Sequence, residues 1–174
     1  MPLPLQISTD ISIDLIDEHH AEDYFQLLHH CMIKPYVPSQ CIPKDIEGAQ
    51  KELRSLFLTH SNGSGFYWGI YTKNKLIGTC GLHSFNSLNK TIEVSYEVHP
   101  DFWSQGIATT CVHFTVEQTP MLFPVEKIRC FTLSDNIASQ KVAIKTGFKR
   151  VSLLEKDCYF NGKLVDRILF EIIL

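Results

Sequence analysis

Long apolar segments are missing from this sequence. No hydrophobic run reaches the roughly 18 residues that a membrane-spanning helix requires, and the first six residues lack the charged start and apolar core of a signal peptide. We therefore expect a cytoplasmic protein with no membrane partner. Blocks of basic residues are missing too: 16 Lys and Arg stand against 19 Asp and Glu, for a net charge of −3. This balance argues against nucleic acid as a partner.

Metal-binding and disulfide patterns are also lacking. The six cysteines are scattered and never form Cys-x-x-Cys, which fits neither a zinc site nor a disulfide framework. We expect no metal, and free thiols that are buried in a reducing compartment. There is no linker, repeat or low-complexity stretch. A chain of 174 residues that is 44% hydrophobic is suited to a single domain, which we place at residues 1–174.

Hydrophobic periodicity predicts a mixed α/β (α+β) fold. The expected order is β, α, α, three antiparallel strands, α, β, α and two closing strands. Alternation with a period of two predicts strands at residues 11–16, 66–72, 76–85, 92–98, 128–133, 149–159 and 165–173. Helical spacing predicts helices at residues 21–31, 45–60, 111–118 and 138–145, the third broken by Pro120 and the fourth capped by Gly147. Turns are expected at Asn74 and at Asn161-Gly162.

One strand-to-helix connection suggests an anion site. The strand that ends at Val98 is followed by His99-Pro100-Asp101, and then Gln105-Gly-Ile-Ala108 leads into a helix. The first N–H groups of a helix have no intrahelical partner and carry partial positive charge. Gly106 and Ala108 have almost no side chain, so a pyrophosphate can approach those groups closely. The alternative interpretation is an ordinary turn that happens to contain a glycine.

Four stretches, in order, resemble the GCN5-related N-acetyltransferases, with the match covering nearly the whole chain. They are Leu76-Ile-Gly-Thr-Cys-Gly81, Glu93-Val-Ser-Tyr96 through Gln105-Gly-Ile-Ala108, Ser134 through Phe148, and Asn161-Gly-Lys-Leu-Val-Asp166. The last resembles the closing hairpin of the branch that contains the ribosomal-protein N-terminal acetyltransferases. The resemblance implies a mixed, mostly antiparallel sheet flanked by helices. It also implies that the strand ending at Val98 splays from the strand beginning near Ile128, with pantetheine in the gap.

The resemblance also implies which residues contact acetyl-coenzyme A (acetyl-CoA) as co-substrate. They are Tyr96, Val98, Trp103, Ser104, Gln105, Gly106, Ile107, Ala108, Thr109 and Asn136. The chain departs from the family at Trp103, where Gln or Arg is usual, and at Thr110, where the branch tends to carry Glu. It also has Ala143 where many members place a general-acid tyrosine, so a tyrosine acid from that position is excluded.

Two catalytic residues follow from the same resemblance. Glu93 matches a position that supplies the general base in some members of the family, usually through a water; the alternative is a carboxylate that only pairs with substrate. Glu97 is a weaker candidate on the same strand face. Ser139 is the candidate acid for the departing thiolate, the alternative being a small packing residue. Asn136 has a helix N-cap as its alternative role, and Tyr96 a core position.

The expected activity is direct transfer of an acetyl group to a primary amine, a protein N-terminal α-amine by analogy with ribosomal-protein acetyltransferases. The alternatives are a small amine acceptor (a polyamine, an amino acid or an amine antibiotic) or a non-catalytic acyl-CoA sensor. We expect the acceptor to enter between residues 24–43 and the closing hairpin, and the protein to be a monomer or a homodimer.

Overall fold

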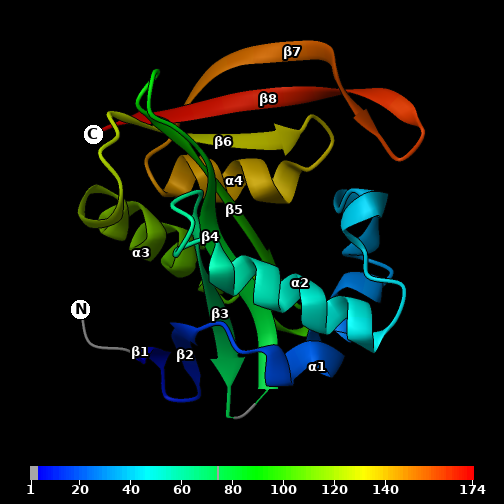
Figure 1. Cartoon of the computed structure of the whole chain (residues 1–174). Coiled ribbons are helices and arrows are strands. Elements are labelled where there is room, and N and C mark those ends of the chain that lie inside the picture. Colours follow the sequence, from blue (N-terminus) through cyan, green and yellow to red (C-terminus); the bar gives the residue numbers. More distant parts are fainter. Residues whose placement is uncertain (1–3, 74) are drawn as a thin grey trace.

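The computed structural model describes residues 4–73 and 75–174. Its strands form one eight-stranded sheet in the order β1-β2-β3-β4-β5-β6-β8-β7 (Figure 1). The strands are β1 (Leu5–Ser8), β2 (Ile11–Leu15), β3 (Phe66–Thr72), β4 (Lys75–Asn86), β5 (Thr91–Val98), β6 (Lys127–Leu133), β7 (Lys149–Phe160) and β8 (Lys163–Ile173). The β5–β6 pair is parallel and the other pairs between described strands are antiparallel. The expected fold class is therefore confirmed.

Helices cover the sheet on two sides. The α-helices are α1 (Ala21–His29), α2 (Ile46–Leu58), α3 (Ile107–Leu122) and α4 (Ile137–Lys145). Short 3-10 turns lie at η1 (Glu18–His20), η2 (Lys34–Tyr36), η3 (Ser39–Cys41) and η4 (Pro100–Phe102). One core cluster joins α1 and α2 to tyrosines of β3, and two others join α3 and α4 to the opposite face of the sheet. Figure 1 shows α2 crossing the central strands, with α3 and α4 near β5 and β6.

The sheet opens between β5 and β6. Parallel pairing is limited to three residue pairs and ends at Glu93 opposite Arg129. Beyond this point β5 runs on to Val98 beside β4, and β6 runs on to Leu133 beside β8. The two strands therefore diverge, and the edges that they turn toward one another are not paired by any described strand.

Several local predictions are confirmed. The helix expected at residues 45–60 is present as α2, and Asp45 is its N-cap, which accepts a hydrogen bond from the Gly48 N–H. Gly147 follows α4 with φ of +91°, a conformation that glycine adopts without strain. Asn161 and Gly162, with φ of +48° and +86°, form the turn between β7 and β8. The turn expected at Asn74 lies outside the described residues.

Three expectations need correction. Helix α3 begins at Ile107 and continues through Pro120 to Leu122. Thr115 and Thr119 are buried, and beyond the proline the Phe123 N–H still donates to the Thr119 carbonyl, 2.9 Å, so packing and the next hydrogen bond hold the helix together. Strand β1 was not predicted, since its four residues carry only a short alternation. The cysteines are free as expected, but Cys31 and Cys41 are exposed rather than buried.

Two negative findings concern the described part of the chain. None of its helices is long and apolar enough to cross a membrane. Within residues 4–73 and 75–174, no group of three or more His, Cys, Asp or Glu side chains is placed to hold a metal ion.

Candidate functional site

The N-terminus of α3 presents a run of free backbone donors. Helix α3 starts after Gly106, whose φ is +80°, and its first hydrogen bond runs from the Thr110 N–H to the Gly106 carbonyl, 2.9 Å. Among the described residues, the N–H groups from Ser104 to Thr109 have no hydrogen-bond partner. Ser104 also has a positive φ, 61°, and turns that contain such residues can form concave anion sites from successive backbone N–H groups. Such a turn is suited to binding phosphate oxygens.

Space is available in front of these donors. A Cβ built on Gly106 meets no atom within 4 Å. The residues from Trp103 to Gly106 are exposed, whereas the Ile107 side chain is buried in the core beside Val98. Ile107 can therefore contact a ligand only through its backbone. The Trp103 indole donates to the Val98 carbonyl, 2.6 Å, which ties the loop to the end of β5.

The divergence of β5 and β6 supplies a second feature. Unpaired strand edges bind extended ligands by backbone hydrogen bonds. Among the described residues, Thr132 of β6 is the one whose buried side chain carries a polar atom without a hydrogen-bond partner. A buried hydroxyl without a partner is costly unless a ligand satisfies it. The open edges, the Thr132 hydroxyl and the Gly106 turn therefore fit the pantetheine and pyrophosphate of coenzyme A.

Tyr96 and Ser139 meet beside this opening. The Tyr96 hydroxyl lies 2.8 Å from the Ser139 hydroxyl and donates to the Ser139 carbonyl at 3.2 Å. The Asn136 side chain accepts a hydrogen bond from the Ser139 N–H, 3.1 Å, so Asn136 is the N-cap of α4. Burial raises the pKa of Tyr96, so its hydroxyl stays protonated at neutral pH. Sequence reasoning named these residues but did not predict the tyrosine–serine contact, which joins β5 to α4.

The other face of β5 carries Glu93, Ser95 and Glu97. Glu93 lies 4.0 Å from His83 Nδ1 and faces Arg129 and Arg167. Burial raises its pKa, and the two guanidinium groups oppose that shift. Arg129 itself donates to Glu171, 2.9 Å, and Arg167 pairs with Asp157. Glu93 is thus part of a mixed cationic and anionic surface on β6 and β8.

Glu97 is placed differently. Its carboxylate accepts a hydrogen bond from the buried hydroxyl of Thr79, which is its partner on β4. Burial raises the pKa of Glu97 to about 7, with a further contribution from the negative charge of Glu52 on α2. Tyr24 of α1 and Tyr67 of β3 feel the charge of Glu97 in turn. No local sequence pattern points to this grouping, because its members come from elements far apart along the chain.

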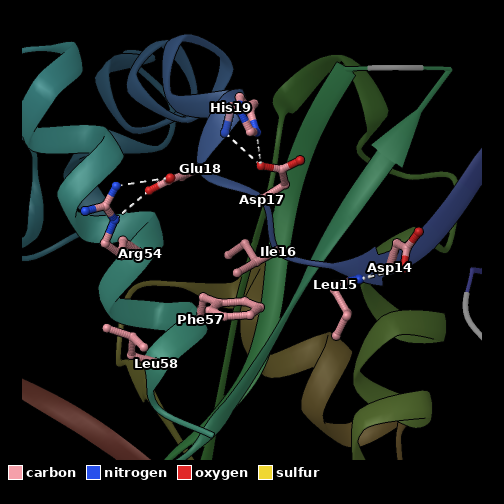
Figure 2. A pocket seen from close by; sticks show the side chains of 9 residues that line it. All are labelled: Asp14, Leu15, Ile16, Asp17, Glu18, His19, Arg54, Phe57 and Leu58. Atoms are coloured by element: carbon pink, nitrogen blue, oxygen red, sulfur yellow. Dashed lines mark hydrogen bonds and ion pairs between the residues drawn. The ribbon is translucent and has the colours of Figure 1, made fainter. Parts of the chain in front are cut away.

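A hollow elsewhere holds none of the predicted residues. It has a volume of about 610 Å³ and lies between the end of β2, η1 and α2 (Figure 2). Four of its charged or ionisable groups are paired, since Arg54 binds Glu18 at 2.7 Å and Asp17 binds His19 at 2.6 Å, while Asp14 accepts a hydrogen bond from the Leu15 N–H, 2.7 Å. Its remaining wall is formed mainly by apolar side chains of β2 and α2, and Figure 2 shows Phe57 and Leu58 there. We find no grouping for group transfer in it.

Comparisons with known proteins agree with this geometry. The family model described as "Acetyltransferase (GNAT) domain" matches residues 11–149. The ribosomal-protein-serine acetyltransferase of Escherichia coli (strain K12) is 21% identical over 174 residues, 98% of this chain and 96% of that protein. The uncharacterized N-acetyltransferase YoaA of Bacillus subtilis (strain 168) is 26% identical over 132 residues, 75% of each chain.

Solved structures share the fold. The microcin C7 self-immunity acetyltransferase MccE, in complex with acetyl-CoA and AMP, superposes with a TM-score of 0.86 at 18% identity, over 100% of this chain and 98% of that one. RimL, a ribosomal L7/L12 α-N-protein acetyltransferase in complex with coenzyme A, has a TM-score of 0.86 at 20% identity, over 98% of both chains. The fold and the family match together define an acyltransferase. Because the family model spans most of its length, the chain belongs to the GNAT acetyltransferase family.

Proposed function

We propose that this enzyme transfers the acetyl group of acetyl-CoA directly to a primary amine, and that the amine is the N-terminal α-amine of a protein. The observation that carries the proposal is the run of free N–H groups from Ser104 to Thr109 next to the divergence of β5 and β6. The acceptor class is supported by the nearly full-length alignment with the Escherichia coli ribosomal-protein-serine acetyltransferase.

Binding of acetyl-CoA is assigned mainly to backbone groups. The N–H groups of Ser104, Gln105, Gly106, Ile107, Ala108 and Thr109 would bind the pyrophosphate, and the open edge of β5 at Tyr96 and Val98 the pantetheine. Trp103 holds the loop against Val98. Asn136 acts by positioning Ser139 at the start of α4. When bound, acetyl-CoA supplies the activated thioester.

Proton transfer is assigned to the two faces of β5. Ser139, hydrogen-bonded to Tyr96, supplies the proton for the departing thiolate, and the Tyr96 hydroxyl orients the serine. An α-amine with a pKa of about 8 is mostly protonated at pH 7 and needs only a modest base. Glu93 is the base proposed from the sequence, and the surroundings of Glu97 make it the competing group.

Isothermal titration with acetyl-CoA, followed by thiol release with an acceptor panel, tests the proposal. The panel contains peptides with free N-termini, polyamines, amino acids and amine antibiotics. We expect binding of acetyl-CoA and turnover with the peptides. Turnover confined to a small amine would show that the acceptor is a small amine and not a protein N-terminus. Binding without turnover on any acceptor would favour an acyl-CoA sensor, and absence of binding would refute the assigned cofactor site.

A further inference from the structure

The starting observation is the position of Glu97 relative to the divergence of the strands. Pairing of β5 with β6 ends at Glu93, and Glu97 lies further along β5, in the part that faces the opening. Side chains alternate along a strand, so Glu97 points away from Tyr96 and toward the face that α1 and α2 cover. Its hydrogen bond from Thr79 of β4 holds the carboxylate in place.

The groups that surround Glu97 are neutral or acidic. Tyr24 of α1, Cys41 of η3, Glu52 of α2 and Tyr67 of β3 act on one another and on this carboxylate electrostatically. Within residues 4–73 and 75–174, Glu97 makes no ion pair with a Lys, Arg or His nitrogen within 4.0 Å. A half-buried carboxylate without a cationic partner is costly, and a bound cation would remove that cost.

A second, independent observation comes from Tyr24. Its side chain is only 5% exposed, and among the described residues its hydroxyl has no hydrogen-bond partner. The charges that act on this hydroxyl most strongly are those of Glu97 and Glu52. The hydroxyl oxygen is not among the fully buried polar atoms that lack a partner, so solvent or a ligand can reach it although the ring is buried. The Tyr24 hydroxyl is therefore free to accept a hydrogen bond from a ligand at Glu97.

Tyr67 forms the remaining wall. Its hydroxyl lies 3.2 Å from Ser95 Oγ, on the same face of β5 as Glu97. The ring lies flat over β4 because residue 81 is glycine: a Cβ there would come within 2.4 Å of Tyr67 Cδ1. The position of Tyr67 is thus built into the sheet, and the glycine of the Leu76-to-Gly81 stretch has a structural reason on the acceptor face.

From these contacts we propose that Glu97, with Tyr24 and Tyr67, forms the subsite that binds the primary ammonium group of the acceptor and takes a proton from it. The inference rests on the proposed acetyl transfer and specifies its acceptor side. The ammonium donates to the Glu97 carboxylate and the Tyr24 hydroxyl, and one proton moves to Glu97 and then to solvent. The neutral nitrogen forms the C–N bond as the C–S bond breaks. Ser139 protonates the departing thiolate, and the nitrogen's second proton, released as the amide forms, passes through solvent and restores the Ser139 hydroxyl.

Glu93 is less suited to this task. Two guanidinium groups face it, and their positive charge would oppose the binding of an ammonium group, whereas burial lowers the pKa of His83 and keeps that ring neutral. The proposal therefore assigns the acceptor's proton to Glu97 and leaves Glu93 to orient the remainder of the acceptor.

The kinetic test uses Glu97→Gln, Glu93→Gln and the control Glu126→Gln, an exposed carboxylate in a surface ion pair with Lys90. We expect Glu97→Gln to lower kcat/KM roughly 100-fold or more, to move the acidic limb of the pH profile from the pKa of Glu97, about 7, to the higher pKa of the amine, and to leave acetyl-CoA affinity unchanged. Glu93→Gln should lower kcat/KM about tenfold and keep that limb. A larger loss in Glu93→Gln, or an unchanged limb in Glu97→Gln, would overturn the proposal. The assays are run separately with peptides and with small amines, and the acceptor that is turned over shows whether the ammonium group belongs to a protein N-terminus or to a small molecule.

A readout without turnover separates this inference from the proposed function. In protein labelled with ¹³C at the glutamate carboxyl carbons, the resonance missing from Glu97→Gln should titrate near pH 7, and a value in the ordinary range would refute the subsite. Tyr24→Phe, which keeps the buried ring, should raise KM for the amine several-fold with acetyl-CoA affinity unchanged. If wild-type protein turns over no amine, the proposed function fails, while the titration still decides whether Glu97 has the environment of a base.

Discussion

The two faces of β5 bind their ligands by different means. On the face toward α3 and α4, the proposed acetyl-CoA site consists of backbone N–H groups, open strand edges and the neutral Tyr96–Ser139 pair. On the face toward α1 and α2, the proposed acceptor site consists of the Glu97 carboxylate and the hydroxyls of Tyr24 and Tyr67, and burial raises the pKa of each of these groups.

The difference has a physical consequence. Backbone donors do not titrate, so we expect acetyl-CoA affinity to change little between pH 6 and pH 8. The acceptor face holds a carboxylate that titrates within this interval, so we expect acceptor turnover to follow its charge. Substitutions on one face of β5 should therefore alter either acetyl-CoA binding or acceptor turnover, but not both.

The largest effect is expected at the helix N-terminus. Gly106→Glu places a negative charge among the phosphate-binding N–H groups, and two unit charges about 4 Å apart repel by about 4 kcal/mol at an effective dielectric of about 20. We expect at least a roughly 100-fold loss of acetyl-CoA affinity by isothermal titration. Gly106→Ala is the matched control, because it carries the cost of the positive φ, of about 1 kcal/mol, without the charge. Equal affinity in the two variants would disprove the phosphate site.

This first site could be predicted from the sequence because its parts are contiguous. The stretch from Glu93 to Thr109 encodes a strand, a glycine turn and a helix start in order, and local geometry then determines where the N–H groups point. The structure confirms that geometry, with Gly106 as the residue before α3. The cofactor roles themselves stay predictions, and Asn136 has the capping role that was its alternative.

The acceptor face could not be predicted in the same way. Tyr24, Glu52, Tyr67 and Glu97 come from α1, α2, β3 and β5, and no local pattern relates them. The family resemblance favoured Glu93 over Glu97, and the arginines that face Glu93 could not be foreseen because they lie on β6 and β8, far along the chain. Pro120 misled for the opposite reason, since a local rule was overridden by the burial of α3.

The Tyr96–Ser139 pair should act on the chemical step alone. Ser139→Ala removes the proposed proton donor, and Tyr96→Phe removes the hydroxyl that orients it. We expect each to lower kcat about tenfold in steady-state assays, and the double variant to fall little below the worse single variant, because the two act as one unit. Additive losses would show that the two side chains act independently. If either substitution changed the acidic limb of the pH profile, the pair would instead take part in removing the acceptor's proton.

Glu97 should also influence stability, in a direction opposite to its proposed role in activity. Its pKa is raised from 4.5 to about 7, so the folded state holds the proton more tightly than the unfolded state. The stability that this provides is complete below pH 4.5 and is lost as the pH rises through 7. Gln keeps the shape without the charge. We therefore expect Glu97→Gln to unfold at a higher Tm than wild type at pH 8, by roughly 1–3 kcal/mol in free energy, with the difference vanishing at pH 4.

The control for this measurement is Glu126→Gln, which should show no gain at pH 8 because surface ion pairs contribute little. If Glu97→Gln lowered the Tm at pH 8, the carboxylate would have a compensating cation in solution, and Glu97 would no longer differ from Glu93 in its surroundings.

The smallest effect is expected where the two halves of the acceptor side touch. Asn161, at the β7–β8 turn, accepts a hydrogen bond from the Ser39 N–H, 2.8 Å, and its amide donates to the Val37 carbonyl, 3.4 Å. Figure 1 shows this turn reaching toward the segment between α1 and α2. These exposed bonds are each worth about 1 kcal/mol. We expect Asn161→Ala to change KM for the amine two- to threefold in steady-state assays, and Asn161→Asp, which keeps the oxygen that Ser39 contacts, to change it less. Because the contact lies away from α3, a change in acetyl-CoA affinity in either variant would mean that the two faces of β5 are coupled.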